Sequence, residues 1–112
     1  MTDSPTPPPP KRYQRFKEDF PAVVEAYEEL GRACHWNGPL DPRTRELIKM
    51  GISIGAGLEG ATRAHVRIAL EAGASEEEIR HAAVLATTTI GFPTMMRAMT
   101  WVEEAMEGQR DR

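Results

Sequence analysis

The sequence is poor in cysteine, in long apolar runs and in charge of one sign, and each shortage excludes a class of protein. A single cysteine, Cys34, can form no intrachain disulfide and no cysteine-based metal cluster. No stretch approaches the roughly 20 apolar residues that a membrane-spanning helix needs. The 14 Lys and Arg residues are interspersed with 17 Asp and Glu residues, so no basic stripe exists to neutralise nucleic-acid phosphates. We therefore expect no disulfide framework, no membrane span and no nucleic-acid partner.

The first residues lack the apolar core of a signal peptide and contain four consecutive prolines at positions 7–10. Proline cannot donate a backbone hydrogen bond and favours an extended, polyproline-like chain. We predict a disordered, proline-rich tail over residues 1–11, one helical domain over residues 12–112, and a cytoplasmic location. A proline-rich ligand for an SH3-like groove is the alternative for the tail.

Helix boundaries are marked by proline near the starts and by glycine just past the ends. Asp41 before Pro42 predicts an N-cap, and Ser75 with Glu78 predicts a capping box. Together these signals predict helices at about residues 21–35, 42–55, 58–72, 75–90 and 93–107. No segment shows sustained alternation of period two, which would indicate a strand. The predicted fold is all-α, with about five to six helices.

Residues 82–96, AAVLATTTIGFPTMM, carry no charge. Two amphipathic helices of a lone small domain should each present a solvated face, and this run leaves too little polar surface for that. The run is too short for a membrane span and is broken by Gly91 and Pro93. We therefore predict that it is buried against another subunit of a homo-oligomer.

His65 is the first candidate for chemistry. It lies four residues after Ala61 and three before Ile68, on the predicted apolar stripe of its helix. A histidine in such a place is most often a core residue with one satisfied hydrogen bond, yet imidazole is also the side chain best suited to proton transfer near neutrality. Glu46, in the preceding helix, would by itself be expected to lie in solvent or to pair with a neighbour such as Arg43 or Arg45.

Two stretches, LDPRTRELIKMGISIGAG and LEGATRAHVRIALEAGASEEEIRHAAVLATTTIGFP, resemble the carboxymuconolactone decarboxylase/AhpD-like family. In AhpD-like members a glutamate is followed twelve residues later by Cys-x-x-Cys, and a histidine follows the second cysteine by four residues. Glu46, Leu58, Ala61 and His65 occupy these offsets, so the acid/base frame matches and the thiols are missing. The resemblance covers roughly residues 18–105. It implies an AhpD-like helical fold that assembles as a trimer or hexamer.

The resemblance implies two chemistries, and the missing thiols separate them. Members with the cysteine pair are taken to act as thiol peroxidases or disulfide reductases, and leucine and alanine form neither a thiolate nor a disulfide. Cys34 has no resolving partner, and we expect it to be a buried structural thiol. The lactone decarboxylases need no thiol. We therefore predict a cysteine-independent, decarboxylase-like lyase that acts on a small carboxylated lactone or related acid, with His65 as the acid and Glu46 as its partner.

For substrate binding we predict a small, mostly apolar pocket beside the pair, with Leu58 and Ala61 in its wall. Arg63 or Arg67 is predicted to bind a substrate carboxylate, and ordinary surface charge is the alternative for both. One alternative for the whole protein is a non-catalytic small-molecule-binding or oligomeric interaction protein. A one-cysteine peroxidase that uses Cys34 is a less favoured one. We predict no cofactor. We also predict no metal, because no two histidines lie four residues apart, and a site built from His35, His65, His81 and a carboxylate is the alternative.

Overall fold

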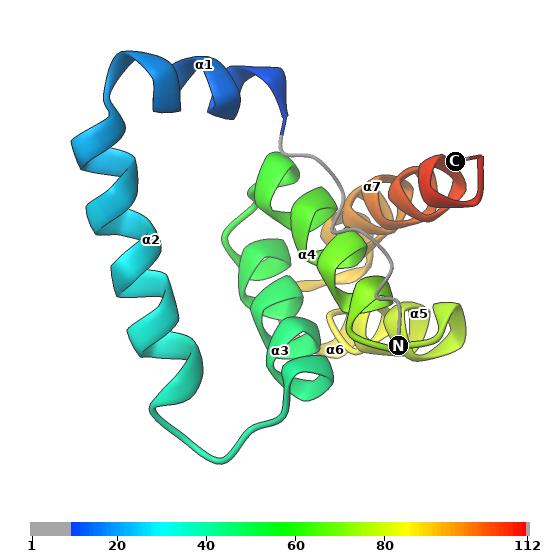
Figure 1. The fold of residues 1–112 in the computed structure, drawn as a ribbon. Coiled ribbons are helices and arrows are strands. Elements are labelled where there is room, and N and C mark those ends of the chain that lie inside the picture. The colour runs from blue at the N-terminus through cyan, green and yellow to red at the C-terminus, as the bar shows by residue number, and fades with distance from the viewer. Residues whose placement is uncertain (1–9, 112) are drawn as a thin grey trace. The chain divides into compact units, whose positions relative to one another are not determined.

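The computed structural model describes residues 10–111, which contain helices and no strand. The helices are α1 (Lys11–Asp19), α2 (Pro21–Trp36), α3 (Pro42–Gly55), α4 (Glu59–Glu71), α5 (Glu76–Val84), the single turn α6 (Thr87–Ile90) and α7 (Phe92–Arg110) (Figure 1). The prediction of an all-α fold is confirmed. Helix α1 is an addition to the predicted set, and it begins at the last residue of the predicted tail. The rest of that tail, except residue 10, lies outside the described residues.

The described chain forms two compact units, residues 10–40 and residues 41–111. The single domain predicted from the sequence therefore stays a prediction. In the first unit α1 and α2 pack together: the Tyr13 hydroxyl donates a hydrogen bond to Glu28 at 2.9 Å, and the rings of Phe16 and Phe20 lie 5.0 Å apart. The second unit contains both predicted catalytic residues.

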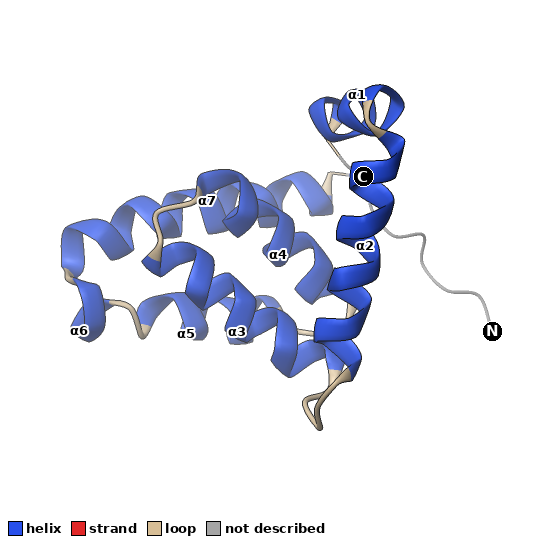
Figure 2. Ribbon diagram, turned by 90° about the vertical axis from the view of Figure 1, so that its left-hand side faces the viewer, coloured by secondary structure: helices blue, strands red, loops and turns tan. Residues whose placement is uncertain are grey.

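Within residues 41–111, α3 and α4 run side by side in opposite directions, and α7 packs against α4 and α5 (Figures 1 and 2). Their facing sides bury one apolar core. Its fully buried members include Met50, Ile54, Val66, Ile79, Ala83, Val102 and Met106. Burial of such side chains contributes about 1.5–3 kcal/mol each for the larger aliphatic ones, so this core holds α3 and α4 in a fixed relation.

The helix boundaries in this unit follow the predicted local signals. The Asp41 carboxylate accepts a hydrogen bond from the Thr44 backbone N–H at 2.9 Å, and Ser75 and Glu78 form both bonds of a capping box. Helix α4 ends before Gly73, whose φ of +100° suits glycine. The predicted N-cap and capping box are confirmed, because each depends only on residues within one turn.

One predicted helix is divided in the structure. The segment predicted as a helix over residues 75–90 becomes α5 and α6, with a turn at Leu85 and Ala86. The Thr87 hydroxyl donates to the Val84 carbonyl at 2.6 Å and the Thr89 hydroxyl donates to the Leu85 carbonyl at 3.1 Å. Hydroxyls bonded to the backbone in this way compete with regular helix geometry, which accounts for the interruption.

The buried side of α4 also differs from the prediction. The sequence predicts its apolar stripe at Leu58, Ala61, His65, Ile68 and Ala69. Of these positions Ala69 is buried as predicted, but the other buried side chains of α4 are Thr62 and Val66, and both Leu58 and Ile68 are exposed. Thr62 is tolerated in the core because its hydroxyl donates to the Leu58 carbonyl at 2.8 Å. The buried side of α4 is thus shifted by about one residue from the predicted apolar stripe, and His65 lies at the edge of the buried side.

The expectation that Cys34 is a buried thiol is wrong, because Cys34 is exposed. The less exposed positions of α2 are Val24, Glu28, Gly31 and His35, which recur every three to four residues. Cys34 lies beside that stripe rather than on it.

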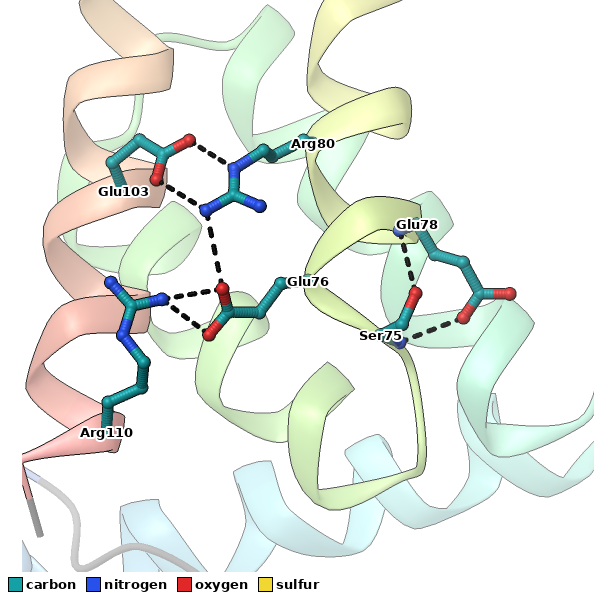
Figure 3. Close-up of polar contacts among 6 residues, drawn as sticks. All are labelled: Ser75, Glu76, Glu78, Arg80, Glu103 and Arg110. Carbon is teal, nitrogen blue, oxygen red and sulfur yellow. Dashed lines mark hydrogen bonds and ion pairs between the residues drawn. The ribbon is translucent and has the colours of Figure 1, made fainter.

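An ionic cluster joins α5 to the C-terminal half of α7 (Figure 3). Arg80 donates to both oxygens of Glu103, at 2.6 and 3.0 Å, and to Glu76 at 3.3 Å. Arg110 donates to both oxygens of Glu76 at 2.6 Å. The cluster places two arginines against two carboxylates, so its formal charges cancel.

No described helix is both long and apolar enough to cross a lipid bilayer.

The Arg80–Glu103 pair predicts a stability that depends on pH. The hydrogen bond from Arg80 holds the pKa of Glu103 below its ordinary value. A carboxyl group with a lowered pKa contributes stability above its unfolded pKa and loses that contribution as the pH falls through its folded pKa. The side chains are 40 % and 35 % exposed, so solvent screening limits the contribution to about 1 kcal/mol.

We therefore expect Glu103→Gln to unfold at lower urea concentration than the wild type at pH 7, and the difference to shrink toward zero as the pH falls below 4. Glu107→Gln, a matched change in the same helix, should alter stability little at either pH. A deficit in Glu103→Gln that persists undiminished in acid would rule out the ion pair as its cause.

Candidate functional site

Glu46 lies in the interior of the second unit, although a glutamate at its position is ordinarily solvated. It is in the second turn of α3, and its side chain is only 2 % exposed. A buried carboxylate is costly unless hydrogen-bond donors and positive charge compensate it. The neighbours of its two oxygens therefore decide whether this residue can remain in place.

His65 on α4 provides one of those neighbours. Its Nδ1 lies 2.8 Å from Glu46 Oε1, and its side chain is 17 % exposed. An ionised carboxylate can only accept a hydrogen bond, so with Glu46 ionised the proton of this bond belongs to His65 Nδ1. The other ring nitrogen, Nε2, is then the atom left to exchange a proton. The structure thus brings together the two residues predicted to be catalytic, from two helices and across 19 positions of sequence.

Arg45 provides the second neighbour; the sequence offered it only as a candidate ion-pair partner of Glu46 and not as a site residue. Its Nε lies 3.8 Å from Glu46 Oε2, and its side chain is 15 % exposed. Its only sequence signal is that it precedes Glu46, and adjacent helical residues ordinarily project in different directions. The burial of Glu46 is a stronger indication that Arg45 belongs to the site, because a buried carboxylate requires a nearby cation.

The four residues predicted for substrate binding lie on or just before α4. Leu58 is the N-cap of α4 and is exposed, and Ala61 is half-buried. Arg63 donates to Glu59 at 3.1 Å and to Glu104 of α7 at 2.6 Å, and the second contact raises its pKa most. Arg67 is half-buried. Arg63 is thus engaged by two carboxylates, which a substrate would have to displace.

A pocket of about 200 Å³ lies between α3, α5 and α6, away from the predicted location. Its lining residues are Gly51, Ile54, Gly55, Ala82, Leu85, Ala86, Thr89 and Ile90. Neither His65 nor Glu46 is among them, so this is not the pocket predicted beside the pair, and a pocket there stays a prediction. The lining contains no charged residue. It would therefore suit an apolar group and offers no partner for a carboxylate.

No cluster of three or more His, Cys, Asp and Glu side chains that could hold a metal ion occurs within residues 10–111. His35 is on α2 and His81 is on α5, so each lies on a different helix from His65. The arrangement that remains for chemistry is therefore the imidazole, the carboxylate and the guanidinium of His65, Glu46 and Arg45.

Comparison with known protein families gives one match. The sequence model of the carboxymuconolactone decarboxylase family matches residues 21–104, which include α2 to α6 and most of α7. No curated protein matches the chain. The matched segment contains all three residues of the cluster around Glu46.

The burial of Glu46 predicts that His65 contributes to stability. We expect His65→Ala to lower the free energy of unfolding by about 1–3 kcal/mol, because it removes the donor to a buried carboxylate oxygen. Urea denaturation followed by circular dichroism would measure this. His81→Ala, which removes an exposed histidine, is the control and should change stability by less than about 0.5 kcal/mol. Equal stability of the two variants would mean that the hydrogen bond to Glu46 is not maintained in solution.

Proposed function

Because the chain belongs to the carboxymuconolactone decarboxylase family, we propose that it is a cysteine-independent lyase that decarboxylates a small carboxylated lactone or a related acid. His65 transfers the proton and Glu46 orients its ring. The observation that carries this proposal is the 2.8 Å hydrogen bond between a buried carboxylate and a partly exposed imidazole. Such a pair has the composition of a general acid with its orienting group.

The proposed reaction needs no thiol and no external oxidant. The bond between the carboxylate carbon and the ring carbon breaks, carbon dioxide leaves, and the bonding electrons delocalise into the lactone carbonyl. A proton from His65 Nε2 then forms the new C–H bond, and solvent returns a proton to the imidazole. Donors near the lactone oxygen would stabilise the developing negative charge. The partial exposure of His65 supports this cycle, because Nε2 must meet both substrate and water.

Substrate contacts are proposed for the residues of α4 that precede and follow His65. Leu58 and Ala61 offer apolar surface two turns and one turn before it, at the two places where AhpD-like members carry cysteine. Arg67 is the proposed partner of the substrate carboxylate. Arg63 is the alternative, and it would exchange Glu59 or Glu104 for the substrate.

A second candidate function is non-catalytic binding of a small apolar molecule or of another protein chain. The uncharged pocket beside α5 and α6 favours it, since that pocket contains no group able to transfer a proton. Peroxidase activity is disfavoured because Leu58 and Ala61 cannot form a disulfide. Cys34, the one thiol, is exposed and has no second cysteine to resolve a sulfenic acid.

Carboxymuconolactone turnover tests the first proposal. We expect the wild-type protein to consume this lactone and release carbon dioxide. His65→Ala should lower kcat by about 100-fold or more, because general acid catalysis typically contributes that much. Glu46→Gln should lower kcat less, since the amide oxygen still accepts from Nδ1. His81→Ala should behave as wild type. Absence of turnover by the wild type would refute this substrate, and unimpaired turnover by His65→Ala would refute the role of His65.

The uncharged run over residues 82–96 supports a proposed homo-oligomer, a trimer or a hexamer. Four large apolar side chains of this run are exposed, among them Leu85 and Phe92, each 59 % exposed, with Val84 and Met96. They lie on the end of α5, the following turn and the start of α7. Several large apolar side chains exposed within one short stretch of chain are typical of an interface.

Light scattering coupled to size exclusion tests the assembly. The wild type should have a mass of three or six times 12.5 kDa. Leu85→Glu and Phe92→Glu should shift the protein toward the monomer, because each places a charge in the interface. Thr100→Glu adds the same charge to an exposed position of α7 outside the run and should leave the mass unchanged. A monomeric wild type would contradict the proposed assembly.

A further inference from the structure

The two oxygens of Glu46 have different neighbours. Oε1 accepts a hydrogen bond from His65 Nδ1 at 2.8 Å, and Oε2 lies 3.8 Å from Arg45 Nε. The Glu46 side chain is 2 % exposed and that of Arg45 is 15 % exposed, so water screens this cluster poorly. The carboxylate is thus placed between a permanent cation and a group that is cationic only when protonated.

A buried carboxylate needs one compensating positive charge, and the identity of that charge determines the behaviour of His65. If His65 were the only compensating group, its second proton would be retained, since losing it would leave Glu46 uncompensated. With Arg45 as the compensating charge, His65 can bind Oε1 as a neutral imidazole through Nδ1–H. Nε2 is then free to bind a second proton and to release it.

We propose that Arg45 is a positioning residue that acts through Glu46. Its guanidinium supplies the charge that keeps Glu46 ionised in the interior, and this leaves His65 free to exchange a proton at Nε2. The catalytic use of that exchange rests on the proposed function. The assignment of charge compensation to Arg45 and of proton exchange to His65 does not rest on the proposed function, because it is argued from the contacts of the three side chains.

Two other arginines of α3 and α4 contact carboxylates other than Glu46. Arg43 contacts Glu78 at 3.3 Å, and Arg63 contacts Glu59 and Glu104. Lys49 on α3 and Arg67 on α4 are the further cations of these two helices. The remaining ion pairs of the helices packed against them join Arg80 to Glu76 and Glu103, and Arg110 to Glu76.

Titration of His65 by NMR, with labelled imidazole nitrogens, tests the proposal without any substrate. In Arg45→Met the imidazolium must compensate Glu46 instead, so the midpoint of the His65 titration should move to higher pH by about one unit, a tenfold change in proton affinity. Arg45→Lys restores the charge and should keep the midpoint near that of the wild type. Arg43→Met removes a cation from the same helix, two residues away, and should leave the midpoint unchanged. A midpoint that stays in place or falls in Arg45→Met would overturn the proposal.

The Glu46→Gln background separates action through Glu46 from a direct effect. With a neutral amide at position 46 there is no buried charge to compensate, so adding Arg45→Met should no longer raise the midpoint. An equal upward shift in that background would show that Arg45 acts on His65 directly and would refute the positioning role. If the wild type decarboxylates no lactone and these shifts still appear, the proposed function fails and the role of Arg45 stands.

Discussion

A hydrogen bond between a buried carboxylate and a half-buried imidazole is the constraint on which the rest of the site depends. His65 and Arg45 approach the two oxygens of Glu46 and so stabilise this carboxylate in the interior of the second unit. The bond also fixes which ring nitrogen of His65 is committed to the protein and which one is available. The core and the site are thus linked, because the apolar contacts that place α3 against α4 also set the distance between the side chains of Glu46 and His65.

Features that depend on a few adjacent residues were predictable from the sequence. Asp41 as an N-cap and Ser75 with Glu78 as a capping box need only local hydrogen bonds, and Gly73 marks the end of α4 because it adopts a positive φ. The pairing of Glu46 with His65 was anticipated from family spacing, not from physical reasoning about either residue. Each residue taken alone favoured an ordinary structural role.

Features that depend on how the helices pack were not predictable in the same way. The buried side of α4 is set by its contacts with α3 and α7, and there Thr62 occupies a core position that hydropathy assigns to an apolar residue. Arg45 enters the site only because the neighbouring carboxylate is buried. The break between α5 and α6 depends on threonine hydroxyls that donate to backbone carbonyls. The spacing of apolar residues along the sequence does not predict these hydrogen bonds.

The first residue of the family's missing cysteine pair corresponds to the N-cap of α4, where Leu58 has an extended backbone and exposes its side chain. The start of a helix carries partial positive charge from its unpaired N–H groups, and that field stabilises a thiolate. The surroundings suited to an activated sulfur therefore persist around a side chain that cannot use them. A cysteine placed at position 58 would therefore lie in a field that favours its thiolate, although Leu58 itself carries no group that can use that field.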